Sequence, residues 1–504
     1  MGGVSKLSQS KVLAENKMPS QAELISLLER YQTGQYSDAE KLAQSFTERF
    51  PKHPFSWKML GAILGQTGRF SESLAYMQKS VQLSPQDAEA HNNLGNVFKA
   101  LGRLDEAEAC YMQAITLRAD YAEAHSNLGN TLKGLGKSDE AEVSYRQAIT
   151  LKPDFAEAHS NLGNTLKQLG RLNEAEASYR QAIALRPNYA EAYSNLGATL
   201  KELGRLAEAE TSCKQAVSLR PDYAEARYNL GLCLFYSEQY GMALKEFELI
   251  DIGLSKSYAV RCSYLQDKES TFYERLDSLI NQGQANAVIG SIICCSEIKY
   301  GIKRENPFCN EPLQYVLKTD LREQYDFDEI FIKTIKEVLA DNSMALKPQP
   351  FLTNGVQTAG NIFAVKKVSG TEIENIIVAE VEKYRARFKG SDEGFIKNWP
   401  TSYKIEGWLV SMRSGGKLAA HMHESGWISG SAYINVPAKS ETDSGNLVLR
   451  LDEQVQAQEL KSQERIIAVE TGSLCLFPSS LHHYTIPFDD KEDRIVLAFD
   501  VIPK

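Results

Sequence analysis

The stretch AEAHSNLGNTLKGLGKSDEAEVSYRQAITLKPDF, residues 122–155, is one copy of a unit that recurs through the first half of the chain. Its apolar residues follow helical spacing on both sides of a glycine-containing break, and Pro153 ends the second segment. Each unit therefore predicts a helix, a turn and a second helix. A glycine recurs every 34 residues in the same phase, at Gly61, Gly95, Gly129, Gly163, Gly197 and Gly231.

Small residues occupy the places where the two helices of a unit must approach each other. In the quoted unit these are Gly129 and Ala141, while Leu128, Leu132 and Tyr145 form apolar stripes at helical spacing. This pattern resembles the tetratricopeptide repeat over residues 20–250, and the resemblance implies a superhelix with a concave groove. We divide the array into seven units that begin near Ser20, Pro54, Ala88, Ala122, Ala156, Ala190 and Ala224.

An asparagine precedes the Leu-Gly pair in the first helix of the central units. These residues are Asn93, Asn127, Asn161, Asn195 and Asn229. The units resemble the superhelix of O-linked N-acetylglucosamine transferases, and that resemblance implies that the amides line the groove and bind the backbone of an extended peptide. An amide both donates and accepts hydrogen bonds, so such a column can hold a chain whatever its side chains. The alternative is that the asparagines tie neighbouring helices together or only solvate the groove.

The second half of the chain carries a group of residues suited to metal chemistry. On a β-strand, residues i and i+2 point to one face, so we expect His421 and His423 to present two imidazoles to one ion. His483 stands in an apolar stretch, residues 472–484, that predicts a strand ending in histidine, and Arg494 opens another predicted strand. Three imidazole ligands would leave coordination positions open on a redox iron. Arginine is a planar, charged partner for a carboxylate.

Residues 403–503 resemble the 2-oxoglutarate/Fe(II) oxygenases of bacteria and their phages, with four sequence blocks in the same order. The resemblance implies a double-stranded β-helix with His421 on an early core strand and His483 on a late one. It also implies Fe(II), O2 and the cosubstrate 2-oxoglutarate, whose distal carboxylate Arg494 would hold. Tyr433 would either donate to the cosubstrate or serve in packing.

One position departs from the pattern of the better-known members. They carry Asp or Glu where this chain has His423, which gives a site of three histidines. Three neutral imidazoles hold iron, and they also make an open zinc site. Glu424 points to the opposite face of an ideal strand and would join the ligands only through a bulge. A site without metal is the remaining alternative.

Composition narrows the class of protein. The 504 residues are 43% hydrophobic, with a net charge of −9 that argues against a partner nucleic acid bound through a large basic surface. No apolar stretch predicts a membrane span or a secretion signal. The eight cysteines lack C-x-x-C spacing and are expected to be reduced thiols, so we expect a cytoplasmic protein.

The sequence thus predicts a multidomain α + β protein. We expect a flexible N-terminus at 1–19, the repeat array at 20–250, a helical linker region at 251–350 and the double-stranded β-helix at 351–504. The predicted function is a 2-oxoglutarate and Fe(II)-dependent dioxygenase that hydroxylates a protein or peptide bound in the groove. Two alternatives stay open, namely a small-molecule oxygenase whose repeats are a scaffold, and a non-catalytic interaction protein with a degenerate barrel.

Overall fold

The computed structural model describes residues 18–340, 346–347, 351–364, 368, 372–438, 441–452 and 463–504. The chain forms two compact units, one ending at Thr165 and the other running from Leu166 to Lys504. All but the last two residues of the predicted flexible N-terminus lie outside the described residues. Among the described residues, none of the helices combines the length and the apolar character that a membrane crossing demands.

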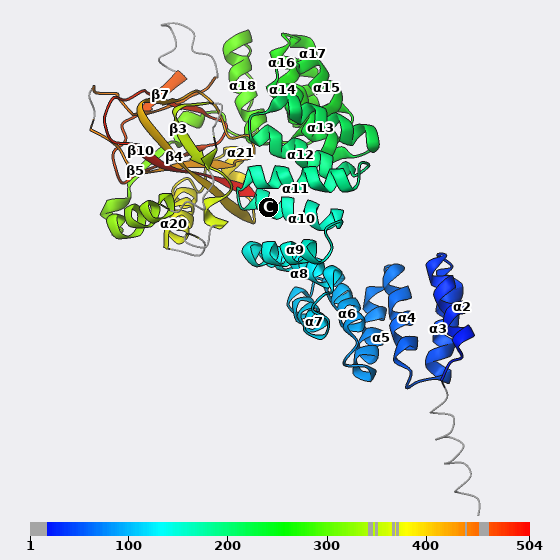
Figure 1. Cartoon of the computed structure of the whole chain (residues 1–504). Helices are drawn as coiled ribbons and strands as arrows, with labels where there is room; N and C mark the ends of the chain where they lie inside the picture. The colour runs from blue at the N-terminus through cyan, green and yellow to red at the C-terminus, as the bar shows by residue number, and fades with distance from the viewer. Residues whose placement is uncertain are drawn as a thin grey trace, which may run out of the picture. The chain divides into compact units, whose positions relative to one another are not determined.

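The first unit consists of paired helices (Figure 1). Its helices are α2 Gln21–Gln32, α3 Tyr36–Arg49, α4 Pro54–Gln66, α5 Phe70–Leu83, α6 Ala88–Ala100, α7 Leu104–Leu117, α8 Ala122–Gly134, α9 Ser138–Leu151 and the greater part of α10 Ala156–Gln168. Five of the seven predicted unit starts fall in this region, and each lies at or next to the first residue of a helix. The predicted helical solenoid is therefore confirmed here.

Glycine in the first helix of a unit makes room for an aromatic ring from the second. A Cβ placed on Gly129 would lie 2.8 Å from Cε1 of Tyr145, and Gly95 stands in the same relation to Tyr111. Tyr145 is fully buried, and its hydroxyl donates to Oδ1 of Asn130 at 2.8 Å. A larger residue at the glycine would displace the ring, so the recurring glycine has a packing reason.

The second unit begins with further helix pairs and continues beyond the repeats. Its main helices are α11 Leu172–Leu185, α12 Ala190–Glu202, α13 Leu206–Leu219, α14 Ala224–Tyr236, α15 Tyr240–Glu248, α16 Ser255–Leu265, α17 Glu269–Asn281, α18 Ala287–Tyr300, α19 Thr334–Leu339, α20 Glu372–Arg387 and α21 Gly394–Lys397. Shorter turns of helix are η1 Pro312–Tyr315, η2 Leu321–Glu323, the π-helix η3 Asp328–Lys333 and η4 Ile362–Ala364.

Two antiparallel sheets follow in the same unit. The strands are β1 Leu317–Asp320, β2 Leu346–Lys347, β3 Leu352–Thr358, β4 Tyr403–Leu418, β5 Ile428–Asn435, β6 Leu447–Arg450, β7 Glu464–Ile467, β8 Ser473–Pro478, β9 His482–Thr485 and β10 Arg494–Pro503. Among the residues that the structure describes, seven strands form one sheet in the order β1-β8-β5-β10-β4-β3-β2, and three form the other in the order β7-β6-β9. The predicted architecture of helical repeats followed by a β domain is confirmed.

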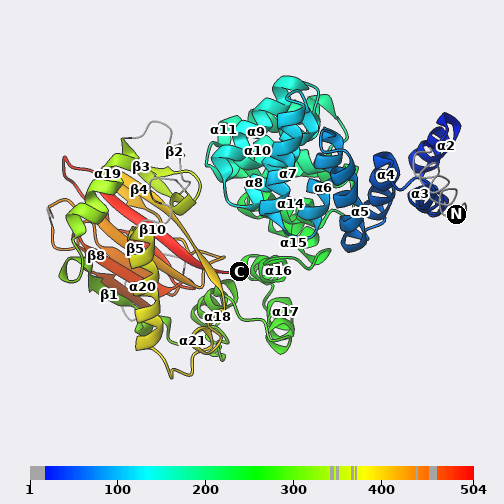
Figure 2. The same cartoon turned by 90° about the horizontal axis from the view of Figure 1, so that it is seen from below.

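Alternation along the strands separates two apolar layers. On β10, Leu497 and Phe499 belong to a core that α20 covers, while Val496 faces the three-stranded sheet. On β5, Ala432 lies under α20 and Tyr433 on the other side. Figure 2 shows α20 lying along the outer face of the large sheet. The other face of the large sheet thus lies toward the three-stranded sheet.

The predicted helical linker, residues 251–350, is not helical throughout, because a strand interrupts its helices. The helices α16 to α18 end at Tyr300, and β1 then pairs with β8 through Leu317 and Leu476. Sheet-forming residues therefore begin before residue 350. The sequence did not reveal this strand because its four residues are too few to show a period.

Candidate metal centre

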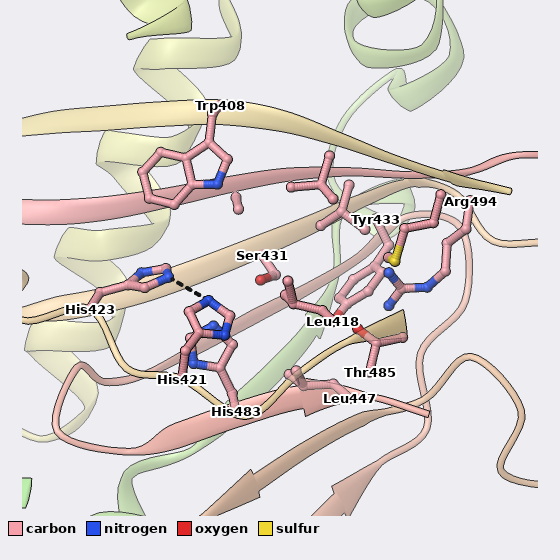
Figure 3. A pocket seen from close by; sticks show the side chains of 14 residues that line it. Trp408, Leu418, His421, His423, Ser431, Tyr433, Leu447, His483, Thr485 and Arg494 are labelled. Carbon is pink, nitrogen blue, oxygen red and sulfur yellow. Dashed lines mark hydrogen bonds between the residues drawn. The ribbon is translucent and has the colours of Figure 1, made fainter. Parts of the chain in front are cut away.

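Three histidine side chains meet between the two sheets (Figure 3). One ligand nitrogen from each of His421, His423 and His483 can be chosen so that all lie within 4.8 Å of one another. The ring centroids of His421 and His483 are 4.3 Å apart. The structure therefore brings together the three residues that the sequence predicted as ligands.

Hydrogen bonds fix the tautomers of two of these rings. Nδ1 of His421 lies 2.9 Å from the carbonyl oxygen of Ala419, and Nδ1 of His423 lies 2.6 Å from Oδ1 of Asp500. Both partners are acceptors, so both Nδ1 atoms carry the proton and both Nε2 atoms of neutral rings present lone pairs. Those Nε2 atoms are only 3.3 Å apart. A cation shared by both lone pairs would satisfy them.

Protonation of His421 or of His483 is disfavoured where these rings lie. Burial lowers the pKa of His421 to about 3, with the neighbouring His423 adding to the effect. Burial also holds the pKa of His483 well below its ordinary value, and Nδ1 of this ring has no hydrogen-bond partner among the described residues. Neutral, desolvated imidazoles are the form that binds a transition metal. The residues present thus fit a metal ion.

The backbone around the ligands differs from the predicted strands. β4 ends at Leu418 and β5 begins at Ile428, so His421 and His423 lie in the connection and not on one strand. His421 is held by an isolated bridge, in which its N–H and C=O pair with those of His483. The prediction of one strand ending at His483 is also wrong. A turn at residues 479–481 separates β8 from β9, which carries His483.

Asp500 is a site residue that the sequence analysis missed. Its Oδ1 accepts from Nδ1 of His423 and, at 2.8 Å, from the hydroxyl of Ser429. A carboxylate behind a ligand histidine fixes the ring orientation and strengthens the lone pair that faces the metal. The available signal was the strand period, because Asp500 lies six residues after Arg494 on β10 and therefore on the same face.

The three histidines share a pocket with Arg494. Its lining is Trp408, Val410, Met412, Leu418, His421, His423, Ser431, Tyr433, Leu447, His483, Thr485, Arg494, Val496 and Ala498, from both sheets and the connection after β4. Arg494 is the first residue of β10, as predicted, and Figure 3 shows its guanidinium within the group of lining side chains.

Arg494 is buried without a counterion among the described residues. It is 2% exposed, and its Nε has no hydrogen-bond partner there. Burial lowers the pKa of this guanidinium. The guanidinium carbon lies 5.0 Å from the centroid of the Tyr433 ring. A desolvated cation in a pocket favours an anionic ligand, for which a carboxylate is the planar match.

Glu424 does not join the histidines. Its Oε1 accepts from Arg261 at 2.5 Å, and its Oε2 accepts from the hydroxyls of Tyr236, at 2.9 Å, and Tyr258. These donors belong to α14 and α16 of the same unit. The sequence left open a bulge that would bring this carboxylate to the metal, whereas its oxygens are bound to helix residues.

The five asparagines of the column are all half-buried on the first helices of their units. The amide of Asn127 donates to Oδ1 of Asn92 at 3.0 Å, and that of Asn229 donates to Oγ of Ser194 at 3.1 Å. At these two positions the asparagine links successive repeats, which is the alternative that the sequence left open. Asn93 lines a hollow in the first unit together with Tyr31, Gly61, Ala62, Gly65, Gln66, Phe70, Met77, Asn96 and Val97.

Comparison with known families agrees with both halves of the chain. Residues 406–500 match a family model described as "Putative 2OG-Fe(II) oxygenase". Models of the tetratricopeptide repeat match residues 28–88, 76–109, 95–136, 135–170, 163–204 and 190–223. No curated protein matches the chain.

Several solved structures resemble the helical part. They include the Cut9–Hcn1 hetero-tetramer of APC/C, with 18% identity, a TM-score of 0.43 and coverage of 50% of this chain and 51% of that one. YrrB, described as a TPR protein with an unusual peptide-binding site, has 20% identity, a TM-score of 0.32 and coverage of 39% and 97%. Pseudomonas aeruginosa pilF has 18% identity, a TM-score of 0.36 and coverage of 39% and 92%. The chain spans about half the length of the first of these.

Proposed function

We propose that this chain, in which tetratricopeptide repeats precede a domain matching the 2OG-Fe(II) oxygenase model, is a cytoplasmic 2-oxoglutarate and Fe(II)-dependent dioxygenase. It hydroxylates a protein or peptide that the repeats bind. The observation that carries the proposal is the meeting of three imidazoles, two buried and one half-buried, with one buried guanidinium in a single pocket.

The histidines would hold Fe(II) and leave coordination positions open. Bound iron supplies the oxidising chemistry, in which O2 and 2-oxoglutarate are consumed and CO2, succinate and a hydroxylated product are released. Asp500 keeps the proton of His423 on Nδ1, so that Nε2 is available to the metal. Trp408 and Val496, which line the pocket, limit the access of water.

Arg494 would bind the distal carboxylate of 2-oxoglutarate. That carboxylate supplies the anion that the buried guanidinium lacks among the described residues, and a bidentate contact would fix the cosubstrate in one orientation. Tyr433 packs its ring against the same guanidinium and limits the positions that the arginine can adopt. The cosubstrate would extend from this end of the pocket toward the histidines.

The position of α14 in the repeat array favours a protein or peptide as the substrate. Asn229 and Tyr236 are seven residues apart on α14, so they lie on one face of that helix. Tyr236 donates to Glu424, the residue that follows His423. The face of α14 that carries the last asparagine of the column thus leads to the connection that carries two metal ligands. A peptide lying along this face would approach the pocket.

The enzyme class is tested by succinate release. Purified chain supplied with Fe(II), ascorbate, O2 and 2-oxoglutarate should release succinate slowly without a substrate. His483→Ala and Arg494→Met should each suppress the release. A folded, metal-loaded protein that releases none would exclude the oxygenase and leave the non-catalytic interaction protein.

The substrate class is tested with a peptide library, read by the mass gain of one oxygen atom. Asn127→Ala combined with Asn161→Ala should abolish product formation and leave uncoupled succinate release unchanged. Asn188→Ala is the matched control, because this asparagine is exposed in a turn outside the column. If the double substitution leaves product formation unchanged, the asparagine column does not bind the substrate.

A second candidate is an oxygenase of small molecules with a scaffolding array. The bonds from Asn127 to Asn92 and from Asn229 to Ser194 favour it, because amides that link units are partly used within the protein. This reading predicts that Asn127→Ala lowers the stability of the array and leaves all turnover intact.

A further inference from the structure

The connection between β4 and β5 is anchored on both sides of the metal ligand His423. On one side, Nδ1 of His423 is bound to Asp500 of the large sheet. On the other, the next residue, Glu424, is bound to α14 and α16. Because adjacent residues share one stretch of backbone, the position of Glu424 constrains the orientation of the His423 imidazole.

Three donors converge on the Glu424 carboxylate. Arg261 bonds to Oε1 at 2.5 Å, while Tyr236, at 2.9 Å, and Tyr258 bond to Oε2. The side chains of Arg261 and Glu424 are 12% and 16% exposed. Charge-assisted bonds in so sheltered a place are stronger and more directional than surface ion pairs.

The donors are themselves fixed by aromatic packing. The ring of Tyr258 stacks on Phe247 with centroids 5.2 Å apart and meets Phe235 edge-on at 5.1 Å. The guanidinium carbon of Arg261 lies 5.1 Å from the centroid of the same Phe235 ring. This cluster joins α14, α15 and α16, so the donors are a rigid part of the helical array.

We propose that Arg261 and Tyr258 are positioning residues, which act through Glu424 to hold the His421–His423 connection in the geometry that binds metal. The inference rests on the proposed function in that it concerns the same metal centre. It adds that the end of the helical array, and not the β domain alone, sets the geometry of the ligands. A partner that displaces α14 or α16 would therefore change metal binding at a distance.

The chain offers a matched control for this ion pair. Arg227 of α14 bonds to Glu246 of α15 at 2.7 Å, with side chains that are 18% and 21% exposed. The pair has the same chemistry and nearly the same burial, but it does not touch the β4–β5 connection. Arg227→Met thus reports what the loss of any such pair does to the array.

The test uses the full chain with two readouts, Co(II) affinity from the visible absorption titration and amide hydrogen exchange of residues 419–427 without metal. Arg261→Met and Tyr258→Phe should weaken Co(II) binding about tenfold, the lower end of the range for outer-shell partners, and should speed exchange in this segment. Arg261→Lys should recover part of the loss, since one N–H···O contact survives. Arg227→Met should change neither readout.

Unchanged Co(II) affinity and exchange in Arg261→Met would overturn the proposal, as would an equal loss in Arg227→Met. If the wild-type chain binds no Co(II), the metal centre itself fails. The exchange measurement then decides the positioning role alone, because it needs no metal. Faster exchange confined to the two network variants would retain the anchoring, and uniform exchange would reject it.

Discussion

Nδ1 of His423 lies 2.6 Å from Oδ1 of Asp500, a carboxylate on β10 that the large sheet holds in place. This contact leaves Nε2 of His423 facing Nε2 of His421 at 3.3 Å. Two lone pairs so arranged are unfavourable without a cation and well placed with one. The contact between His423 and Asp500 thus prepares a site of three histidines in which a carboxylate lies behind one of the ligands.

Asp500→Ala should weaken metal binding about 10- to 100-fold, because the His423 ring loses the partner that fixes its tautomer. A Co(II) titration followed by visible absorption measures the change. Asp489→Ala is the control, since that carboxylate accepts from Ser414 away from the histidines. Affinity within twofold of wild type in Asp500→Ala would contradict the assigned role.

His423→Asp should not create a better iron site, although it restores the more familiar ligand type. The new carboxylate would stand close to Asp500, and two like charges in one buried place disfavour each other. Metal affinity should fall in the single variant and recover in His423→Asp combined with Asp500→Asn. The same titration reads both, and a single variant that binds as tightly as wild type would be evidence against the carboxylate contact.

Arg494→Met should leave the apoprotein as stable or about 1 kcal/mol more stable, because a buried cation without a carboxylate partner is removed. The variant should also lose any stabilisation by 2-oxoglutarate. Urea unfolding with and without the cosubstrate measures both effects.

Arg450 provides the contrast for that variant. It is 4% exposed and bonds to the buried Asp452 at 2.8 Å. Arg450→Met would leave a buried charge unpaired and should cost about 3–5 kcal/mol. Equal losses in Arg450→Met and Arg494→Met would show that Arg494 also has a carboxylate partner.

Gly170→Ala should destabilise the second unit more than Gly204→Ala. Both glycines have positive φ, +77° and +76°, so each substitution costs about 1–2 kcal/mol from the backbone. A Cβ on Gly170 would also lie 2.3 Å from the carbonyl oxygen of Ala359, whereas nothing lies within 4 Å of one on Gly204. Urea denaturation compares the two, and equal losses would argue against this close contact between the repeats and the residue that follows β3.

The metal-free protein should lose stability on acidification below about pH 6.5, the ordinary pKa of histidine. Burial lowers the pKa of His421 to about 3 in the folded state, so between these values the unfolded chain binds the extra proton. Stability should therefore fall with decreasing pH, by up to about 1.4 kcal/mol per unit for this group. Chemical denaturation across this range measures the slope, which His421→Gln should reduce. A slope that the substitution leaves unchanged would refute the lowered pKa.

The repeats could be predicted from the sequence because each repeat is defined by residues that lie close together along the chain. Pro54, Ala88 and Ala122 each begin a helix where the 34-residue phase places them. The identities of the candidate ligands were also accessible, since His421 and His483 are chemically distinctive. Their strands were not, because the bridge between them joins residues far apart in the chain.

The partners behind the ligands escaped prediction for the same reason. Asp500 contacts His423 across 77 residues, and Arg261 contacts Glu424 across 163. No periodicity in the sequence reports such pairs. The strand period was the one local indication, because it places Arg494 and Asp500 on the same face of β10. It does not identify the residues that this face contacts.

The metal centre is best tested by anaerobic titration of the purified apoprotein with Fe(II) and 2-oxoglutarate. The wild-type chain should show a visible metal-to-ligand charge-transfer band that is lost or weakened in His423→Ala and in Arg494→Ala. A folded, metal-replete wild-type protein that shows no band would contradict the three-histidine oxygenase site.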